Sequence, residues 1–267
     1  MSLELYDAQE TRLAMEALEV LGSTLPGTFL LLGGWAVYLT VSDSFRKEHG
    51  SPYLGSRDVD IGFHIDEDAR LVDLRRSDFA KAIAVLKDVG YFPMGSYRFC
   101  KIVNRIDGKE LNEAEAKRVS MHDLFYLYVD VMVDHIHPDH QRAFGLKPLD
   151  EPMLATVFEE DSGIVVAVGR SKVMVPSPEH LLATKLKSIV SRDREDKLIK
   201  DACDIYALMW HSDLPFREIA ERVRKKYPNE CASAQRVIDL EVARRASVHL
   251  GVEVERFTGV VGLLSES

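Results

Sequence analysis

Apolar positions in the first 175 residues change repeatedly between the spacing of a helix and that of a strand. Residues 7–21 place apolar side chains three or four positions apart, which predicts a helix that ends at Gly22. Residues 28–32 form a short apolar run, which predicts a buried strand. The remaining predicted elements are a helix over 35–41, a polar loop over 42–55, strands over 58–64, 92–103 and 124–136, a helix over 77–89, an irregular segment over 141–163, and a hairpin over 164–175.

From residue 176 onward, only helical spacing remains. Ser177 followed by Pro178 is typical of a helix N-cap and first helical position. The helical pattern is then broken at four places, which divide it into four or five helices: Arg192, Pro215, Pro228 and Gly251. The change of period predicts two domains, residues 1–175 and residues 176–267.

These patterns together predict an α+β protein. A mixed sheet of about five strands with flanking helices would form the N-terminal domain, and a helical bundle would follow it. With 46% hydrophobic and 29% charged residues in a chain of 267, the composition is that of a globular protein and argues against disorder.

Charge and cysteine content narrow the class of partner and the compartment. A formal net charge of −9 makes a bulk electrostatic grip on nucleic acid an unlikely mode of binding. The three cysteines lie far apart without C-x-x-C spacing, so neither a disulfide framework nor a zinc knuckle is indicated. The first residues lack the order of a signal peptide, and no apolar run reaches the length of a membrane span. We therefore expect a cytoplasmic protein with no membrane partner.

Two aspartates one residue apart lie inside an apolar run. On a strand, Asp58 and Asp60 would point to the same face, while Val59 and Ile61 point into the core. Two adjacent carboxylates repel each other unless a cation lies between them, and a divalent metal ion is the usual solution. Taken alone, a D-x-D pair is a weak signal, because such pairs are also common in loops.

A third aspartate interrupts the strongest strand pattern of the chain. Asp130 lies in the middle of residues 124–136, where strand propensity disfavours a carboxylate. Coordination of the same metal ion would compensate for that cost. Asp134 shares the face of Asp130 and is the alternative, but it lies near the strand end, where an exposed carboxylate costs little. A nearby group, His135, His137 and His140, has metal-like spacing, although a solvated exit from the strand explains it more simply.

Gly33 and Gly34 join the first predicted strand to a helix. One interpretation is a tight turn that requires a positive φ angle. The other is a phosphate site, where N–H groups at a helix N-terminus bind an anion. The surrounding sequence matches neither a P-loop nor a Rossmann fingerprint.

The combination of strand, Gly-Gly, helix, D-x-D strand and later aspartate resembles the nucleotidyltransferase superfamily, which has the DNA polymerase β-like fold. The resemblance implies that Gly33, Gly34 and Ser56 contact the phosphates of an NTP. It also implies that Asp58, Asp60 and Asp130 are catalytic and hold Mg²⁺ or Mn²⁺, with Asp130 as the candidate general base. The expected reaction transfers a nucleoside monophosphate to an acceptor hydroxyl.

A later pair of predicted helices resembles one subgroup, the AbiEii-like nucleotidyltransferases, which include toxins of type IV toxin–antitoxin systems. The resemblance is carried by Lys185 on one helix and by Asp201 and Asp204 on the next. It implies that Lys185 is a catalytic residue that engages the nucleotide phosphates, with the acidic pair nearby. The implied partners are an NTP, an acceptor such as tRNA or a protein, and a cognate antitoxin. The simpler alternative is a charged helix face on which Lys197 pairs with Asp201.

Two departures from the family pattern concern the segment before the D-x-D strand. Leu54 stands where the family commonly has an arginine, and residues 42–55 are longer than usual. A competing hypothesis is a catalytically inactive nucleotide-binding or regulatory module, and a third is a metal-dependent hydrolase. The intact set of three aspartates argues against the module, and Gly33-Gly34 with Lys185 favours a triphosphate substrate over the hydrolase.

Overall fold

The computed structural model describes residues 8–25 and 28–265, and the contacts within it divide this chain into two compact units. The first, which we call the sheet unit, contains residues 8–32 and 56–175. The second, the helical unit, contains residues 33–55 and 176–265. The two units meet in the sequence at residue 175, which is the predicted domain boundary. Residues 33–55 were predicted to belong to the N-terminal domain, but they group with the C-terminal helices.

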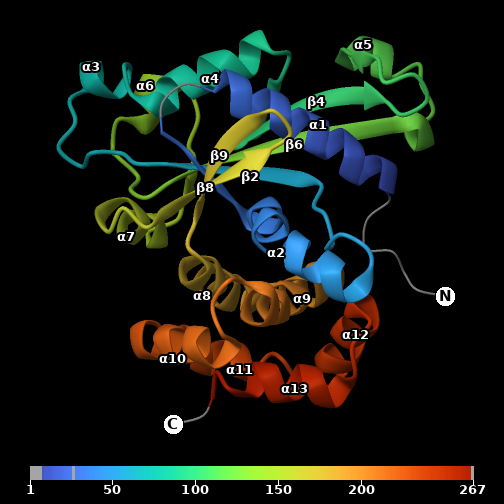
Figure 1. Cartoon of the computed structure of the whole chain (residues 1–267). Coiled ribbons are helices and arrows are strands. Elements are labelled where there is room, and N and C mark those ends of the chain that lie inside the picture. Colours follow the sequence, from blue (N-terminus) through green and yellow to red (C-terminus); the bar gives the residue numbers. More distant parts are fainter. Residues whose placement is uncertain (1–7, 26–27, 266–267) are drawn as a thin grey trace. The chain divides into compact units, whose positions relative to one another are not determined.

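A mixed sheet of nine strands forms the centre of the sheet unit in the described chain (Figure 1). The strand order is β3-β4-β6-β2-β1-β9-β8, with β5 paired to β4 and β7 paired to β6. The strands are β1 (Leu30–Leu32), β2 (Asp58–Phe63), β3 (Phe92–Met94), β4 (Arg98–Asn104), β5 (Glu110–Leu111), β6 (Leu124–Val133), β7 (Leu149–Asp150), β8 (Gly163–Val168) and β9 (Ser171–Pro176). The predicted mixed sheet is confirmed, and it exceeds the expected five strands because several edge strands are too short to show a period of two.

Helices cover both faces of this sheet. α1 (Ala8–Thr24) contacts β2, β6 and β8, and α4 (Asp78–Asp88) packs through Phe79, whose ring centroid lies 5.4 Å from that of Phe63 on β2. On the opposite face, α7 (Met153–Glu159) and α5 (Glu113–Ala116) cover separate apolar clusters, around Leu154 and Ala116 respectively. The strip of sheet between these two clusters carries the predicted acidic residues.

The segment 141–163 is not irregular as expected. It contains α6 (His140–Phe144), β7 and α7, each too short to show a clear hydrophobic period. A further short helix, α3 (Leu71–Leu74), precedes α4. The predicted helices over 7–21 and 77–89 and the hairpin over 164–175 are confirmed as α1, α4 and the β8–β9 pair.

The helical unit is built from α2 and the C-terminal helices. α8 (Pro178–Ile189) and α9 (Glu195–His211) lie side by side, and α2 (Gly33–His49) contacts both (Figure 1). Ser177 and Pro178 occupy the predicted N-cap and first positions of α8. Six helices follow residue 176 in the described chain, where four or five were expected, and the remaining four are α10 (Phe216–Lys226), α11 (Pro228–Gln235), α12 (Leu240–Leu250) and α13 (Val254–Gly262).

The predicted polar loop over 42–55 is wrong for most of its length, because α2 continues to His49. Val37, Val41 and Phe45 are buried at a spacing of four residues, so the helical stripe runs on beneath a polar outer face. Gly50, with a φ angle of +75°, follows the end of the helix. Polar residues on the exposed side of an amphipathic helix were mistaken for a loop.

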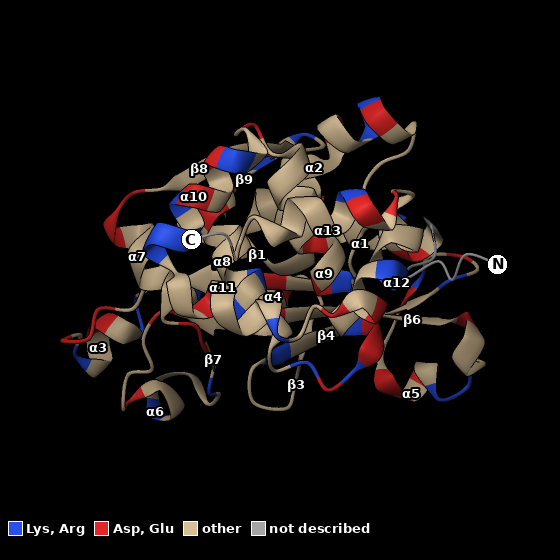
Figure 2. Ribbon diagram, turned by 90° about the horizontal axis from the view of Figure 1, so that it is seen from below, with Lys and Arg blue, Asp and Glu red and all other residues tan. Residues whose placement is uncertain are grey.

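Charges of both signs occur in both units. Figure 2 shows basic and acidic residues interspersed along the ribbons rather than gathered on one basic element. None of the helices in the described residues has the length and apolar character needed to cross a membrane.

Candidate functional site

Strand pairing brings the three predicted aspartates onto one face of the sheet. β2 and β6 are parallel neighbours, with Asp60 paired to Asp130 and Asp58 paired to Tyr128. Residues paired in this way point to the same side of a sheet. The carboxylates of Asp58, Asp60 and Asp130 therefore share a single face, which we call the acidic face.

The core side of these strands is closed to solvent, whereas the acidic face is partly open, although Asp130 on it is only 6% exposed. Val59, Ile61, Val129 and Val131 point to the core side and are at most 1% exposed. On the acidic face, the side chain of Asp58 is 22% exposed. Because the apolar partners fix the register, the aspartates cannot turn to the other side without burying carboxylates in the core.

An arginine from the neighbouring strand lies among the carboxylates. Arg98 on β4 donates two hydrogen bonds to Asp130, each 2.6 Å long, and its Nη2 lies 4.0 Å from Oδ2 of Asp58. Its guanidinium carbon also lies 4.5 Å from the ring centroid of Tyr128. The hydrogen bonds to Asp130, with the charges of Asp130 and Asp58, raise the pKa of Arg98 above its ordinary value despite partial burial. A permanent cation therefore balances part of the charge on the acidic face.

Arg98 was not among the residues predicted for the site. The signal available was a charged residue alternating with buried Cys100 and Ile102 on the same strand face. Its partner Asp130 is 32 residues away, so the pairing becomes evident only from the antiparallel register of β4 and β6.

Asp134 is buried rather than exposed at the strand end, contrary to expectation. Its Oδ1 accepts a 2.8 Å hydrogen bond from the backbone N–H of Ile65, and its Oδ2 lies 2.5 Å from Nδ1 of His64. Both oxygens thus hold the chain that leaves β2. This structural role favours Asp130 as the third carboxylate of the acidic face.

The two glycines occupy the start of α2. β1 ends at Leu32 and α2 begins at Gly33, whose φ angle is +62°. Leu32 is paired with Asp60, so the helix begins one residue beyond a neighbour of the acidic face. The positive φ angle alone accounts for glycine at position 33, and phosphate binding there stays a prediction. Ser56 is 7% exposed, and its hydroxyl donates to the carbonyl oxygen of Asp58 at 3.3 Å.

In the helical unit, the structure brings Lys185, Asp201 and Asp204 together. Nζ of Lys185 lies 2.8 Å from Oδ1 of Asp201 and 2.8 Å from Oδ2 of Asp204. Lys185 is 7% exposed, Asp201 2% and Asp204 0%. These groups do not form a solvated helix face, so the simpler alternative from the sequence is wrong.

Further cations surround this buried acidic pair. Arg192 Nε lies 2.5 Å from Oδ2 of Asp201, and Lys200 Nζ lies 2.5 Å from Oδ1 of Asp204. The Tyr53 hydroxyl donates to the same Asp204 oxygen at 2.7 Å. We call Tyr53, Lys185, Arg192, Lys200, Asp201 and Asp204 the buried charge network. With every group in its usual ionised form, it carries one positive charge in excess.

The pKa shifts follow from that arrangement. Burial alone would raise the pKa of Asp201, but the charges of Lys185 and Arg192 outweigh it and lower the pKa to about 2. Burial opposes the charge of Lys185, yet Asp201 and Asp204 raise its pKa above the ordinary value. For Lys200, burial and the charge of Lys185 lower the pKa despite the pairing with Asp204. The sequence analysis missed Lys200 and Tyr53, although Lys200 stands four residues before Asp204 on one helix face.

The histidines near residue 135 do not form a metal-ligating group. His140 is 2% exposed and packs between Phe79 and Phe144, with ring centroids 6.0 and 5.5 Å away. The interpretation as a solvated strand exit is wrong for His140, which belongs to the core beneath α4.

Comparison with known families decides the identity of the fold. A family model described as "Nucleotidyl transferase AbiEii toxin, Type IV TA system" matches residues 104–254, more than half of the chain. The chain belongs to the AbiEii family. The predicted resemblance is thereby confirmed, and with it the fold class, an α+β nucleotidyltransferase-like mixed sheet followed by a helical bundle. The AbiEii match includes Asp130, Lys185, Asp201 and Asp204, whereas Gly33, Gly34, Ser56, Asp58 and Asp60 lie before it.

Among solved structures, the chain is similar to an antigenic nucleotidyltransferase-like protein from Paracoccidioides brasiliensis. The two share 14% identity with a TM-score of 0.44, over 84% of this chain and 93% of the other. The search of curated protein sequences gave no match.

Proposed function

We propose that this AbiEii-family chain transfers a nucleoside monophosphate from an NTP to an acceptor hydroxyl. The α-phosphorus would form a bond to the acceptor oxygen, while its bond to pyrophosphate breaks. The observation that carries the proposal is the register of β2 and β6, which gathers Asp58, Asp60 and Asp130 on one face. Phosphoryl transfer requires that metal ions and substrate are held in fixed positions and that the phosphate charge is balanced. The register of β2 and β6 fixes the positions of the three carboxylates that would do this.

The donor set of the acidic face fits a hard divalent cation. Asp58, Asp60 and Asp130 supply only carboxylate oxygens, which Mg²⁺ and Mn²⁺ prefer. Arg98 donates a hydrogen bond to each oxygen of Asp130, so a metal ion would share this carboxylate with a guanidinium. When bound, the metal would neutralise the triphosphate and lower the pKa of the acceptor hydroxyl.

Asp130 is the proposed general base, which takes the proton of the acceptor hydroxyl onto its carboxylate. The two hydrogen bonds from Arg98 occupy one lone pair on each oxygen of Asp130, so the proton would be accepted on a second lone pair or after one of these bonds opens. Gly33, Gly34 and Ser56 stay the predicted phosphate contacts. Lys185, with Asp201 and Asp204, stays a predicted nucleotide-binding group, and the third N–H donor of Lys185, beside its two ion pairs, would be the one to contact a phosphate.

For the acceptor and the biological role, we propose only a class of molecule and a type of system. The description of the AbiEii family supports a toxin of a type IV system, with a cognate antitoxin as partner. tRNA and proteins are the acceptor classes we propose, and the cytoplasm is the proposed location.

The test uses α-labelled NTPs, one at a time, with Mg²⁺ or Mn²⁺ and either total tRNA or candidate protein acceptors. We expect label transfer by the wild-type chain and a loss of at least about 100-fold in Asp60→Asn, because a metal-holding carboxylate becomes a neutral amide. Asp68→Asn is the matched control, since Asp68 is exposed in the same unit and should leave transfer unchanged.

Three other outcomes would contradict the proposal. NTP binding without transfer would favour the inactive nucleotide-binding module. Release of inorganic phosphate or nucleotide without an acceptor product would favour the hydrolase. Transfer that persists in Asp60→Asn would remove the acidic face from the reaction.

A further inference from the structure

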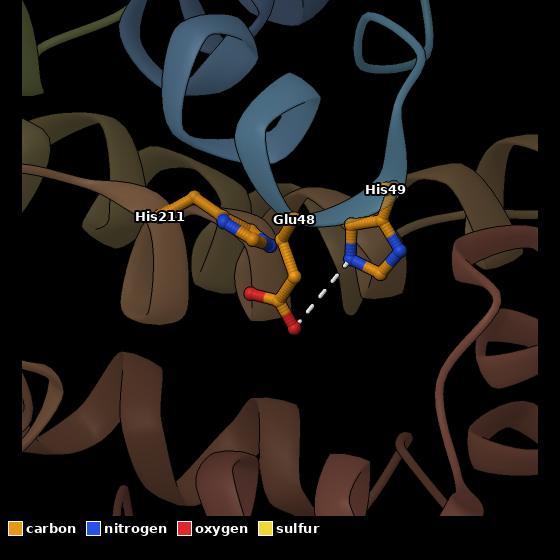
Figure 3. A group of neighbouring side chains, drawn as sticks. All are labelled: Glu48, His49 and His211. Carbon is orange, nitrogen blue, oxygen red and sulfur yellow. Dashed lines mark ion pairs between the residues drawn. The ribbon is translucent and has the colours of Figure 1, made fainter.

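Three side chains of types that bind metals converge in the helical unit, and none of them belongs to the buried charge network. Glu48 and His49 lie in the last turn of α2, and His211 is the last residue of α9. One ligand atom from each of the three lies within 4.8 Å of the other two. Figure 3 shows the three side chains turned toward one another, with Oε1 of Glu48 3.9 Å from Nε2 of His49.

Two of these ligand atoms are buried without a hydrogen-bond partner. Nε2 of His49 and Nε2 of His211 are both enclosed, and neither has a partner among the described residues. His211 is only 2% exposed, so solvent does not satisfy its ring nitrogen. Buried polar atoms are nearly always paired in folded proteins, and these two imidazole nitrogens, which lack hydrogen-bond partners and lie beside one carboxylate, are atoms that a metal ion could bind.

Neighbouring residues restrict the orientation of the two histidine rings, as is usual for metal ligands. Nδ1 of His211 lies 3.3 Å from the hydroxyl of Ser44, and in the tautomer in which Nδ1–H donates to that hydroxyl, Nε2 carries the free lone pair. Phe45 stacks on His49 at 4.2 Å and meets His211 edge-on at 5.1 Å, so both rings have restricted rotation.

Two residues outside the group, Trp210 and Arg256, orient the carboxylate of Glu48. Its Oε2 accepts a 3.1 Å hydrogen bond from Nε1 of Trp210, and its Oε1 lies 2.5 Å from Nη2 of Arg256. Ligating carboxylates are commonly hydrogen-bonded in this way, and each oxygen retains a second lone pair. Arg256 carries a positive charge, so the ion must bind strongly enough through the two imidazoles to offset that repulsion.

We propose that Glu48, His49 and His211 bind a divalent ion of the zinc class. Two imidazole nitrogens and one carboxylate oxygen form a set that zinc favours, whereas Mg²⁺ prefers oxygen ligands alone. Ligand atoms of a tetrahedral zinc ion lie about 3.3 Å apart, so side-chain rotations of about 1 Å would close the group. Three protein ligands leave a fourth position for water. The ion would tie the end of α2 to the end of α9, and it is independent of the acidic face.

The experiment titrates Zn²⁺ into metal-free protein by calorimetry, with Mg²⁺ in excess to occupy sites made of oxygen atoms. We expect one tight Zn²⁺ per chain, binding at least about 100-fold weaker in both His49→Gln and His211→Gln. Zn²⁺ should raise the Tm of the wild type and not that of the two variants. His249→Gln is the matched control, because His249 is partly buried on α12 of the same unit and lies outside the group.

Co²⁺ supplies a second readout that needs no variant to fold. A strong visible absorption band, typical of tetrahedral Co²⁺, is expected when Co²⁺ binds to the wild-type chain and should be displaced by Zn²⁺. Absence of stoichiometric Zn²⁺ binding, equal affinity in the wild type and either histidine variant, or a weak octahedral Co²⁺ spectrum would each overturn the proposal. Retention of the site in Asp60→Asn, with or without nucleotidyl transfer, separates this result from the test of the enzymatic function.

Discussion

At the scale of single residues, Arg98 is the residue that most changes the electrostatics of the acidic face. Three carboxylates on one side of a sheet repel one another, and the guanidinium of Arg98 reduces that repulsion before any substrate arrives. Its charge also competes with the metal proposed for the same carboxylates. We therefore expect Arg98 to stabilise the fold and to lower the affinity of the acidic face for the proposed divalent cation.

Replacement of Arg98 by glutamine should separate these two effects. Loss of the charged pair with Asp130 should lower the free energy of unfolding by about 1–2 kcal/mol, a value reduced for partial solvent screening. Mn²⁺ should bind several-fold more tightly, because a positive charge near Asp58 and Asp130 is removed. Urea unfolding and Mn²⁺ titration by electron paramagnetic resonance measure the two quantities, with Arg118→Gln, an exposed arginine of the same unit, as the control. Weaker or unchanged Mn²⁺ binding would show that Arg98 does not compete with the metal.

At the scale of secondary-structure elements, α2 is the helix whose place in the fold departs most from the order of the chain. It follows β1 directly, yet it groups with helices that begin more than 120 residues later. It ends at the residues proposed to bind zinc, and the segment after it supplies Tyr53, which donates to Asp204. The C-terminal helices therefore lack part of their own packing when α2 is absent.

A fragment of residues 176–267 should fail to fold as a cooperative unit. Without residues 33–55 it exposes the face of α9 that α2 covers, and it leaves Asp204 without the hydroxyl of Tyr53. A chain in which residues 33–55 are joined by a flexible linker to residues 176–267 should recover helicity and a sigmoidal unfolding curve. Circular dichroism on thermal unfolding compares the two, and equal cooperativity in both would contradict the division into units.

How much of the fold could be predicted from sequence depended on how far apart the interacting residues lie. The alternation in β2 and β6 identified Asp58, Asp60 and Asp130, because each strand carries its own pattern of apolar neighbours. The end of α2 could not be placed, since Asp43 and Ser44 are polar in a loop and on an exposed helix face alike. The pairing of Arg98 with Asp130, and that of Tyr53 with Asp204, required a register or a packing arrangement that no local period encodes.

At the scale of the whole molecule, buried histidines couple stability to pH. His140 is buried with both ring nitrogens unpartnered among the described residues, and its protonation would place a charge in the core. Burial, followed by the charges of His137 and His135, lowers the pKa of His140 from 6.5 to about 4. The unfolded chain thus binds this proton more readily than the folded chain does, so stability falls as the pH decreases from 6.5 and levels off near 4.

His140→Phe should remove that contribution. The free energy of unfolding of the variant relative to the wild type should rise by about 2–3 kcal/mol as the pH is lowered from 6.5 to 4. Phenylalanine fits between the rings of Phe79 and Phe144 without a titratable group. Denaturant unfolding at a series of pH values measures the difference, and His122→Gln, at an exposed position, is the control. A difference that stays constant with pH would show that His140 titrates normally.

The buried charge network limits which substitutions this sequence can accept during evolution. Replacement of Asp204 takes the carboxylate from two buried ammonium groups, and replacement of Lys185 removes an ion pair from both Asp201 and Asp204. Viable changes at these positions must come as concerted sets, which are rare. Strict invariance of Lys185, Asp201 and Asp204 among homologues would then follow from folding alone. An unchanging lysine here is therefore no sign of a role in the reaction, and only kinetics measured beside stability can assign one.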